Sequence, residues 1–227
     1  ELWRLDVKWT DSYSRDVDGS ALVINDTVYI GLENSLFTIL NPDPDYADTL
    51  DGMLQPQIIR EITLYEKKDA IAHRNNVVTE SSPCRLGDVI YIASGSGHVY
   101  GYDMKKQQLS WDFFIGSDID GSAVVTDDSC LIVTLEKQYI KGKGGAFKLN
   151  PLKPPQESVV WYFPTENAKY STWEGGIIGS AGINDAYHDG ELPYLAVFAA
   201  IDGYIYVVEH TLIKDKTSVK GPDGIKR

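Results

Sequence analysis

The sequence predicts an all-β fold, a β-propeller built from about four four-stranded antiparallel blades. Three observations support this prediction. One pattern of strands and turns occurs four times in the 227 residues, and Gly, Asn and Asp lie in the turns between short apolar runs. The aromatic residues are mainly 14 Tyr and 5 Trp, which are types that favour strands.

Each copy of the pattern has a small-residue strand, a turn, an apolar strand, a Gly-containing hairpin and a second apolar strand. The copies occupy residues 18–40, 80–103, 120–150 and 179–208. In the second copy, which is the most regular, Val89–Ala93 and His98–Asp103 flank the turn Gly95-Ser96-Gly97. The third copy has a longer hairpin before Gly144-Gly145. Turns of this composition tolerate a positive φ and predict β-hairpins.

A further strand precedes each copy and is expected to complete its blade. The strand before the first, third and fourth copies carries Trp3, Trp111 and Trp161, respectively. Before the second copy, residues 58–65 take this place without a Trp. We interpret the Trp residues as packing at the joint between neighbouring blades. Boundaries near 57, 108 and 158 then divide residues 1–210 into blades at 1–57, 58–108, 109–158 and 159–210, followed by a polar tail at 211–227.

Charge and composition exclude several classes of function. The formal net charge of −12 argues against nucleic acid or anionic lipid as a partner. No apolar run approaches the roughly 20 residues that a membrane span needs. The chain opens on Glu1-Leu2-Trp3 without a leader, so any signal peptide is expected to have been removed. Cys84 and Cys130 fit no metal or redox spacing, which leaves either a disulfide or two buried thiols.

The run from Val89 to Asp103, followed by Leu109-Ser110-Trp111, resembles the pyrroloquinoline-quinone-like (PQQ-like) repeat. Asp202-Gly203-Tyr204-Ile205-Tyr206 resembles it nearly as closely. The resemblance covers about residues 1–210 and implies propellers that usually close with seven or eight blades. This chain is therefore expected to form part of a larger ring, which further blades, a second copy or another chain would complete.

The resemblance also bears on function. Members that use the quinone have a calcium site and commonly a disulfide between adjacent cysteines, and this sequence has no such pair. No quinone cofactor is therefore expected. The non-enzymatic relatives imply a secreted or periplasmic binding or scaffold module that engages a protein or a glycan. The alternative is the propeller domain of an enzyme such as a quinone-dependent dehydrogenase.

Carboxylates recur where two of the copies begin, and they suggest a cation site. Asp16-Val17-Asp18-Gly19-Ser20 matches Asp118-Ile119-Asp120-Gly121-Ser122, and Glu80 falls at the position of Asp18 and Asp120. Oxygen ligands of this kind suit Ca²⁺. The alternative is that these residues only shape the turn into the innermost strand. The candidate metal ligands are Asp16, Asp18, Glu80, Asp118 and Asp120.

Long connections at 9–17, 66–78, 136–143 and 165–175 are expected on one side of the propeller, which we call the loop face. Aromatic and charged groups on loops over a rigid scaffold are typical of recognition surfaces, although loop aromatics can also serve only to pin a loop. No catalytic residues are predicted. The candidate binding residues are Trp9, Tyr13, His73, Arg74, Tyr139, Tyr170, Trp173 and Glu174.

Overall fold

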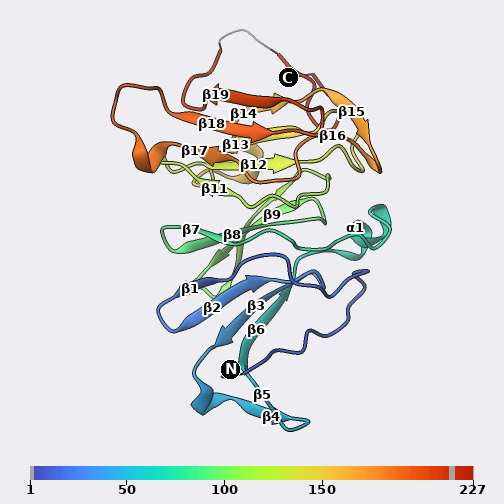
Figure 1. Cartoon of the computed structure of the whole chain (residues 1–227), viewed down its shortest axis with the longest axis vertical. Helices are drawn as coiled ribbons and strands as arrows, with labels where there is room; N and C mark the ends of the chain where they lie inside the picture. The colour runs from blue at the N-terminus through green and yellow to red at the C-terminus, as the bar shows by residue number, and fades with distance from the viewer. Residues whose placement is uncertain (1–2, 215–217, 227) are drawn as a thin grey trace.

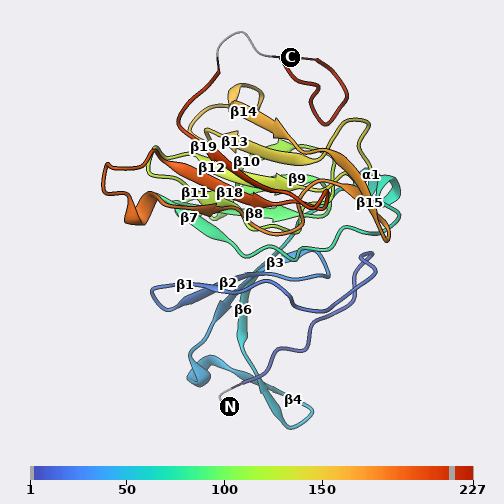
Figure 2. The same cartoon turned by 45° about the horizontal axis from the view of Figure 1, so that its top comes forward.

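The structure is a computed structural model that describes residues 3–214 and 218–226. It contains a row of β-sheets that follow one another along the chain (Figures 1 and 2). Strands take 41% of the residues and helices 7%, which confirms the predicted all-β class. The row does not close on itself, as expected for part of a propeller. No helix in the described part of the chain is long and apolar enough to cross a membrane.

Three sheets have four antiparallel strands each, and a fourth sheet has three. Blade 1 consists of β1 (Leu22–Ile24), β2 (Thr27–Gly31), β3 (Leu36–Asn41) and β6 (Gln57–Thr63). Blade 2 consists of β7 (Cys84–Leu86), β8 (Val89–Ser94), β9 (His98–Asp103) and β10 (Gln108–Phe114). Blade 3 consists of β11 (Val124–Val125), β12 (Leu131–Leu135), β13 (Gly145–Leu149) and β14 (Val159–Pro164). Blade 4 consists of β17 (Gly182–Ile183), β18 (Leu195–Ala199) and β19 (Ile205–Glu209).

Shorter elements lie in the connections. The acidic segment after β3 forms a hairpin of β4 (Asp48–Leu50) and β5 (Met53–Gln55), and the segment after β14 forms one of β15 (Asn167–Tyr170) and β16 (Trp173–Gly175). One helical turn, α1 (Lys67–Ala72), follows β6. The remaining elements are three short 3₁₀ turns, η1 (Pro44–Tyr46), η2 (Pro155–Glu157) and η3 (Asp185–Tyr187).

The outer strands differ from the prediction in the sheet they join. β6, β10 and β14 pair with the strand before them, whereas boundaries at 57, 108 and 158 would place them with the copy that follows. The reason is connection length: only residues 104–107 separate β9 from β10, while 115–123 separate β10 from β11. A short link between adjacent strands favours an antiparallel hairpin. As defined by their hydrogen bonds, the first three sheets therefore span residues 22–63, 84–114 and 124–164.

Apolar cores fill the spaces between blades. Tyr29, Phe37 and Ile39 of blade 1 meet Ile90 and Ile92 of blade 2. Blade 2 meets blade 3 in a second core, and blade 3 meets blade 4 in a third. Each strand contributes side chains to both of its faces, so the inner strands β8, β9, β12 and β13 are almost continuously buried.

One side chain of each outer strand also forms a hydrogen bond to the next blade. Trp111 and Trp161 donate their indole N–H groups to the carbonyl oxygens of Lys153 and His210, each over 3.0 Å. In blade 1, which lacks a Trp at this place, the Arg60 guanidinium donates to the carbonyl oxygen of Gln107 over 2.5 Å. The interpretation of Trp111 and Trp161 as joint residues agrees with these contacts.

Serines form a second set of links at the inner ends of the blades. The backbone N–H of Ser20 donates to Ser82 Oγ over 2.9 Å, that of Ser82 to Ser122 Oγ over 2.8 Å, and that of Ser122 to Ser180 Oγ over 2.8 Å. Each donor lies in one blade and its acceptor in the next. The blades come so close here that a Cβ on Gly121 would meet the carbonyl oxygen of Gly179 at 2.8 Å.

A buried lysine joins blades 3 and 4. Lys148, which is 1% exposed, places its Nζ 2.6 Å from Asp128 Oδ2 and 3.0 Å from the carbonyl oxygen of His210. His210 Nε2 lies 2.8 Å from Asp185 Oδ1. The lysine charge is thus paired and hydrogen bonded, as a buried charge must be. Elsewhere in the core, Cys84 and Cys130 are free thiols, and burial raises the pKa of Cys84 to about 12.

Candidate functional site

The four long connections contact one another in sequence and form the loop face. The Tyr13 backbone N–H donates to the carbonyl oxygen of Asn75 over 3.1 Å, and Asn76 Nδ2 donates to the Tyr139 hydroxyl over 3.1 Å. The Lys137 backbone N–H donates to the carbonyl oxygen of Gly175 over 2.9 Å. In Figure 1, α1 and the β15–β16 hairpin project on the same side of the row of blades.

The structure places four of the five candidate metal ligands in two groups, with Glu80 interacting with both, and each group gains a glutamate that was not predicted. Asp16 and Asp18 lie with Glu33 in blade 1, whereas Asp118 and Asp120 lie with Glu136 in blade 3. The two trios occupy equivalent places in the repeat. Each trio contains an equivalent backbone hydrogen bond. The Glu33 N–H donates to the Asp16 carbonyl oxygen over 3.3 Å, and the Glu136 N–H donates to the Asp118 carbonyl oxygen over 3.2 Å.

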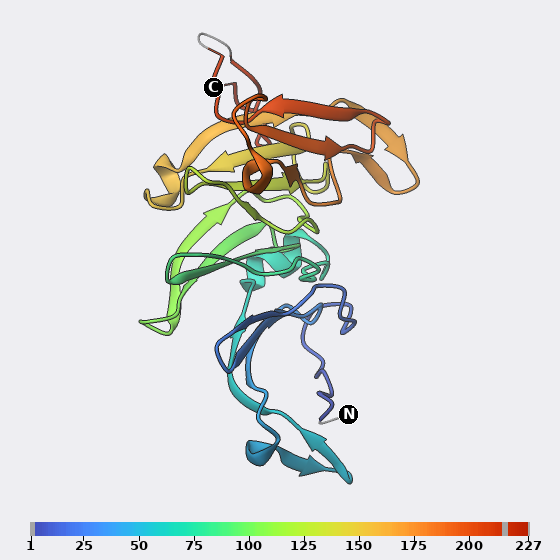
Figure 3. The ribbon, with the colours of Figure 1, turned by 60° about the vertical axis from the view of Figure 1, so that its left-hand side comes forward.

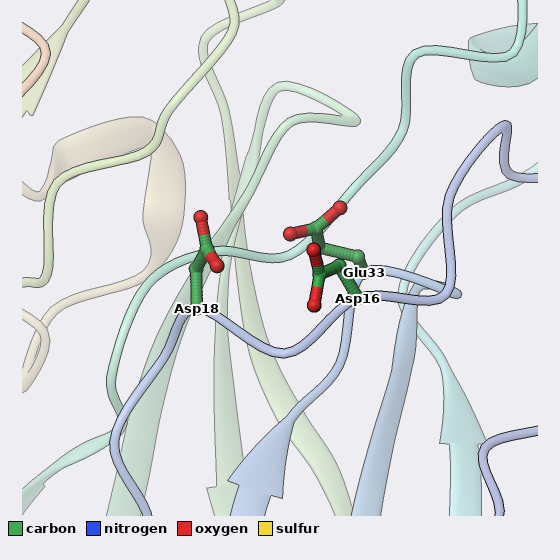
Figure 4. Close-up of side chains that lie close together, drawn as sticks. All are labelled: Asp16, Asp18 and Glu33. Atoms are coloured by element: carbon green, nitrogen blue, oxygen red, sulfur yellow. The ribbon is translucent and has the colours of Figure 1, made fainter.

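The blade 1 trio combines two exposed carboxylates with the buried Glu33. Asp16, Asp18 and Glu33 each place one carboxylate oxygen within 4.8 Å of the other two, where the chain approaching β1 passes the β2–β3 turn (Figure 4). Burial raises the pKa of Glu33. A hydrogen bond from Ser14 opposes this rise, and the charges of Asp18 and Asp16 add to it. Asp16 and Asp18 are exposed. The calcium site proposed for these residues stays a prediction.

The blade 3 trio is largely buried. Glu80 of blade 2 interacts with both trios, since its charge acts on Asp118 and Asp120, and burial followed by the charges of Glu33 and Asp18 raises its own pKa. We call Glu80, Asp118, Asp120 and Glu136 the acidic centre. Asp118 is 4% exposed and Glu136 is fully buried. Asp120 interacts with both Asp118 and Glu136. Burial and then neighbouring carboxylates raise the pKa of Asp118 and of Asp120 to about 8, and mainly burial raises that of Glu136 to about 7. At neutral pH the acidic centre therefore retains protons that ordinary carboxyl groups would have lost.

Several oxygen atoms of the acidic centre have unused hydrogen-bonding capacity. Asp118 Oδ2 accepts from Asn76 Nδ2 over 2.7 Å, and Glu136 Oε2 accepts from Gln138 Nε2 over 2.6 Å. Their second oxygens, together with Asn76 Oδ1, are buried without a hydrogen-bond partner among the described residues. A buried polar atom left unpaired costs about 1 to 3 kcal/mol. A cationic or N–H-donating ligand would remove that cost.

Aromatic side chains surround the acidic centre. His73 stacks on Tyr139 with ring centroids 4.2 Å apart, and its Nδ1 lies 2.6 Å from the carbonyl oxygen of Gly95. Trp173 interacts with Glu136 and favours the charged form of that carboxyl group. Tyr13 lies close enough to Glu80 and Asp118 for their charges, after burial, to raise its pKa. Burial lowers the pKa of His73.

The other candidate binding residues lie further out. Tyr170, 68% exposed, stacks on Trp173 with ring centroids 6.2 Å apart, and Glu174 pairs with Lys137 over 3.3 Å. Burial raises the pKa of Tyr139, and the charge of Arg74 lies close enough to oppose that rise. Trp9 is 63% exposed, and the Arg15 guanidinium carbon lies 5.1 Å from the centroid of its ring. None of the described contacts of Trp9 reaches the acidic centre.

The structure reveals site residues that were not predicted. Glu33 and Glu136 each follow the first apolar strand of their copy, so aligning the copies beyond that strand would have identified them. Asn76 lies in the loop after α1, outside the repeated pattern, and the sequence carries no signal for it.

Comparison with known proteins identifies the fold. No family model matches the chain, and no curated protein matches its sequence. Among solved structures, the chain is similar to the quinohemoprotein alcohol dehydrogenase ADHIIG from Pseudomonas putida HK5, with a TM-score of 0.61 and 12% identity over 86% of this chain and 33% of that one. It is also similar to BamB from Moraxella catarrhalis, with a TM-score of 0.52 and 15% identity over 99% of this chain and 62% of that one.

A third similar structure is the quinohemoprotein alcohol dehydrogenase from Comamonas testosteroni, with a TM-score of 0.53 and 11% identity over 91% of this chain and 43% of that one. The chain thus spans less than two thirds of each of these proteins. At such identities the similarity establishes the fold alone, a β-propeller of the kind found in quinoprotein dehydrogenases and BamB. The fold does not distinguish a dehydrogenase domain from a binding propeller.

Proposed function

We propose that this chain is a non-catalytic binding module of a secreted or periplasmic protein, and that its loop face recognises a protein partner. A basic side chain of the partner would enter the acidic centre. The observation that carries the proposal is the set of buried oxygens of Asp118, Glu136 and Asn76 that find no partner within the described chain. A lysine ammonium or an arginine guanidinium supplies several N–H donors together with the opposite charge.

The surrounding aromatic side chains support this choice of ligand. Tyr and Trp rings attract a cation to their faces, and Trp173 and Tyr139 lie beside carboxyl groups of the acidic centre. A neutral glycan would use the same rings but would leave the carboxyl groups without a counter-charge. A quinone cofactor has less support. The relatives that use the quinone commonly carry a disulfide between adjacent cysteines, whereas the two cysteines of this sequence, Cys84 and Cys130, are far apart.

The test uses short peptides of known charge on the purified chain. Calorimetric titration with hexalysine is expected to give binding that hexaglutamine, of similar length but without charge, does not give. The double change Asp120→Asn with Glu136→Gln should weaken hexalysine binding about tenfold or more, in line with the loss of charge-assisted hydrogen bonds. The matched control is Asp48→Asn with Asp51→Asn, which replaces two exposed carboxyl groups of the β4–β5 hairpin by amides and should change the affinity little.

Proton release provides a second measurement. Because Asp118 and Asp120 have pKa values near 8, a bound cation at pH 7 should drive their protons into the buffer. Titrations in buffers of different ionisation enthalpy would detect this release, and Asp120→Asn should reduce it. The proposal fails if hexalysine does not bind, if both double variants lose affinity equally, or if a neutral oligosaccharide binds and the acidic-centre variant retains that binding.

A further inference from the structure

A buried histidine lies where the helical turn α1 meets blade 2. Figure 3 shows α1, in blue-green, against the strands of that blade. His98, the first residue of β9, is 4% exposed. Its imidazole stacks on the Tyr100 ring with centroids 5.0 Å apart, and the centroid of the Phe114 ring lies 4.6 Å away. Packing of this kind holds the imidazole in one orientation.

A carboxylate faces each nitrogen of this imidazole. His98 Nδ1 lies 2.6 Å from Asp112 Oδ1 on β10, and His98 Nε2 lies 3.5 Å from Asp69 Oδ2 on α1. A neutral imidazole donates from one nitrogen and accepts at the other, whereas a carboxylate only accepts. With a single proton on Nδ1, Nε2 would turn its lone pair towards a carboxylate, and Nε2 is buried without a hydrogen-bond partner among the described residues. A second proton, on Nε2, makes this contact an ion pair.

Asp69 is a buried carboxyl group that needs a counter-charge. It is 2% exposed, and its Oδ2 accepts the backbone N–H of Glu66 over 2.7 Å at the beginning of α1. A charged carboxylate suits that bond, and a buried charge is costly unless it is paired. Within the described chain, the contact with His98 is the one ion pair that Asp69 makes. The adjacent Lys68 pairs with the Glu66 side chain instead, over 2.9 Å.

The other titratable groups near His98 leave this arrangement in place. They are one residue of β9 and three of the α1 segment, namely Tyr100, Glu66, Lys68 and His73. Burial and then the charge of Asp112 raise the pKa of Tyr100, which keeps its hydroxyl neutral, and burial lowers the pKa of His73. The pair between Lys68 and Glu66 is exposed to solvent. The carboxylates of Asp69 and Asp112 are therefore the charges that lie against His98.

The segment that Asp69 anchors continues into the wall of the acidic centre. The His73 N–H donates to the Asp69 carbonyl oxygen over 2.8 Å, and the Asn76 N–H donates to the His73 carbonyl oxygen over 3.0 Å. Asn76 Nδ2 in turn donates to Asp118 Oδ2 over 2.7 Å, while the His73 ring stacks on Tyr139. Consecutive hydrogen bonds thus connect Asp69 with the acidic centre.

We propose that His98 carries protons on both ring nitrogens and joins Asp112 of blade 2 to Asp69 of α1, and that this imidazolium link holds Asn76 at the acidic centre. His98 is a positioning residue, because it acts on the site through α1. A site that is already held in its binding geometry loses less conformational freedom when the ligand binds. The effect on ligand binding rests on the proposed function, whereas the link itself does not.

The first test reads the protonation of the histidine rings from nitrogen-15 NMR of the wild-type chain at pH 7. Both ring nitrogens of His98 should give the shifts of an imidazolium. His73 is the internal control and should be neutral, since burial lowers its pKa. Single variants such as His188→Gln assign the signals. An unprotonated nitrogen in the His98 ring would overturn the proposal, including the case in which Asp69 holds the proton.

The second test measures how firmly α1 is held. Asp69→Asn retains an oxygen that can accept from Glu66 but removes the charge that faces His98. The amide hydrogens of His73 and Asn75, which bond to the carbonyl oxygens of Asp69 and Ala70, should then exchange about tenfold faster, in line with the loss of a charge-assisted hydrogen bond. The control is Lys68→Gln, which breaks an exposed ion pair of the same turn and should leave these rates unchanged. Equal exchange in the wild type and Asp69→Asn would contradict the link.

The third test uses the sign of an effect on hexalysine binding. His98→Gln removes a positive charge, so electrostatics alone would make a cationic peptide bind more tightly. Loss of the link should instead weaken binding several-fold, whereas Lys68→Gln, which also removes a positive charge from this region, should not weaken it. Unchanged or tighter binding by His98→Gln would refute the positioning role. If the wild-type chain does not bind hexalysine, the proposed function fails, and the NMR and exchange measurements still decide the link.

Discussion

The indole N–H of Trp111 donates to the carbonyl oxygen of Lys153 over 3.0 Å, and through this bond the outer strand of blade 2 is tied to blade 3. The ring itself lies in the core between the two blades, with Val133 and Phe147. Trp111 therefore contributes both apolar contact and one directed hydrogen bond to the joint.

We predict that Trp111→Ala lowers the free energy of unfolding by about 3 to 5 kcal/mol, as truncation of a buried aromatic typically does. Trp111→Phe retains a ring and loses the hydrogen bond. Its cost in unfolding free energy should therefore be about 1 kcal/mol for the hydrogen bond, with a further cost for the smaller ring. Urea denaturation measures both. The exposed Trp9 is the control, and Trp9→Ala should cost about 0.5 kcal/mol or less. An unchanged midpoint in Trp111→Ala would contradict the structural role.

Lys148 should be sensitive to truncation. Lys148→Ala removes the charge that Asp128 and the His210 carbonyl oxygen share, and loss of one partner of a buried pair costs about 3 to 5 kcal/mol. Lys148→Met retains most of the volume without the charge and should be the milder change. Thermal unfolding of the two variants gives the comparison. If both variants match the wild type, the contact does not stabilise the joint between blades 3 and 4.

Stability should fall as pH rises from about 5 to 9, because the raised pKa values of Asp118, Asp120 and Glu136 let the folded chain hold protons that the unfolded chain has released. This contribution is fully present below the unfolded pKa values near 4 and is lost as pH passes through the folded values. Asp103 and Asp128, whose pKa values are lowered, act in the opposite sense at lower pH.

The measurement is the free energy of unfolding by urea at several pH values. Asp120→Asn cannot ionise and should flatten the slope, while Asp48→Asn at an exposed position of the β4–β5 hairpin should leave it unchanged. Wild-type stability that rises across this range would show that the acidic centre is ionised in the folded state.

Tyr170 and Trp173 should matter more for binding than for stability. The two rings stack at the tip of the β15–β16 hairpin, and Tyr170 is 68% exposed. Exposed aromatic residues often dominate binding interfaces. The double change Tyr170→Ala with Trp173→Ala should weaken hexalysine binding several-fold and shift the unfolding midpoint little. A large loss of stability, or unchanged binding, would assign both residues to packing of the hairpin.

The repeat made the blades predictable, because each copy carries its own turns and apolar strands. Sheet membership of β6, β10 and β14 was harder to predict, since these strands lie between copies and share apolar residues with both. The link between Asp103 and Gln108 is short and the link after Phe114 is long, and this difference indicates that β10 joins the sheet of β9. Connection length therefore decides what hydrophobic pattern alone leaves open.

The candidate site was predictable in part for a similar reason. Asp118 and Asp120 stood out because Asp16 and Asp18 repeat them, and Glu136 has the same kind of counterpart in Glu33. The difference in environment could not be read from these residues. Blades 1 and 3 carry matching trios, yet Asp16 and Asp18 are exposed while Asp118 is buried and Asp120 half-buried, because neighbouring loops with their own sequences decide the burial.

The directional ladder of serine hydrogen bonds has a consequence for the energetics of the whole chain. Each blade is stabilised by the joints on its two sides, and the same contacts recur at every joint, so the chain should behave as a one-dimensional array with nearest-neighbour coupling. In a single copy the two end blades have one joint each and the inner blades two. Amide hydrogens should therefore exchange fastest in blades 1 and 4, and opening should propagate inward from the ends.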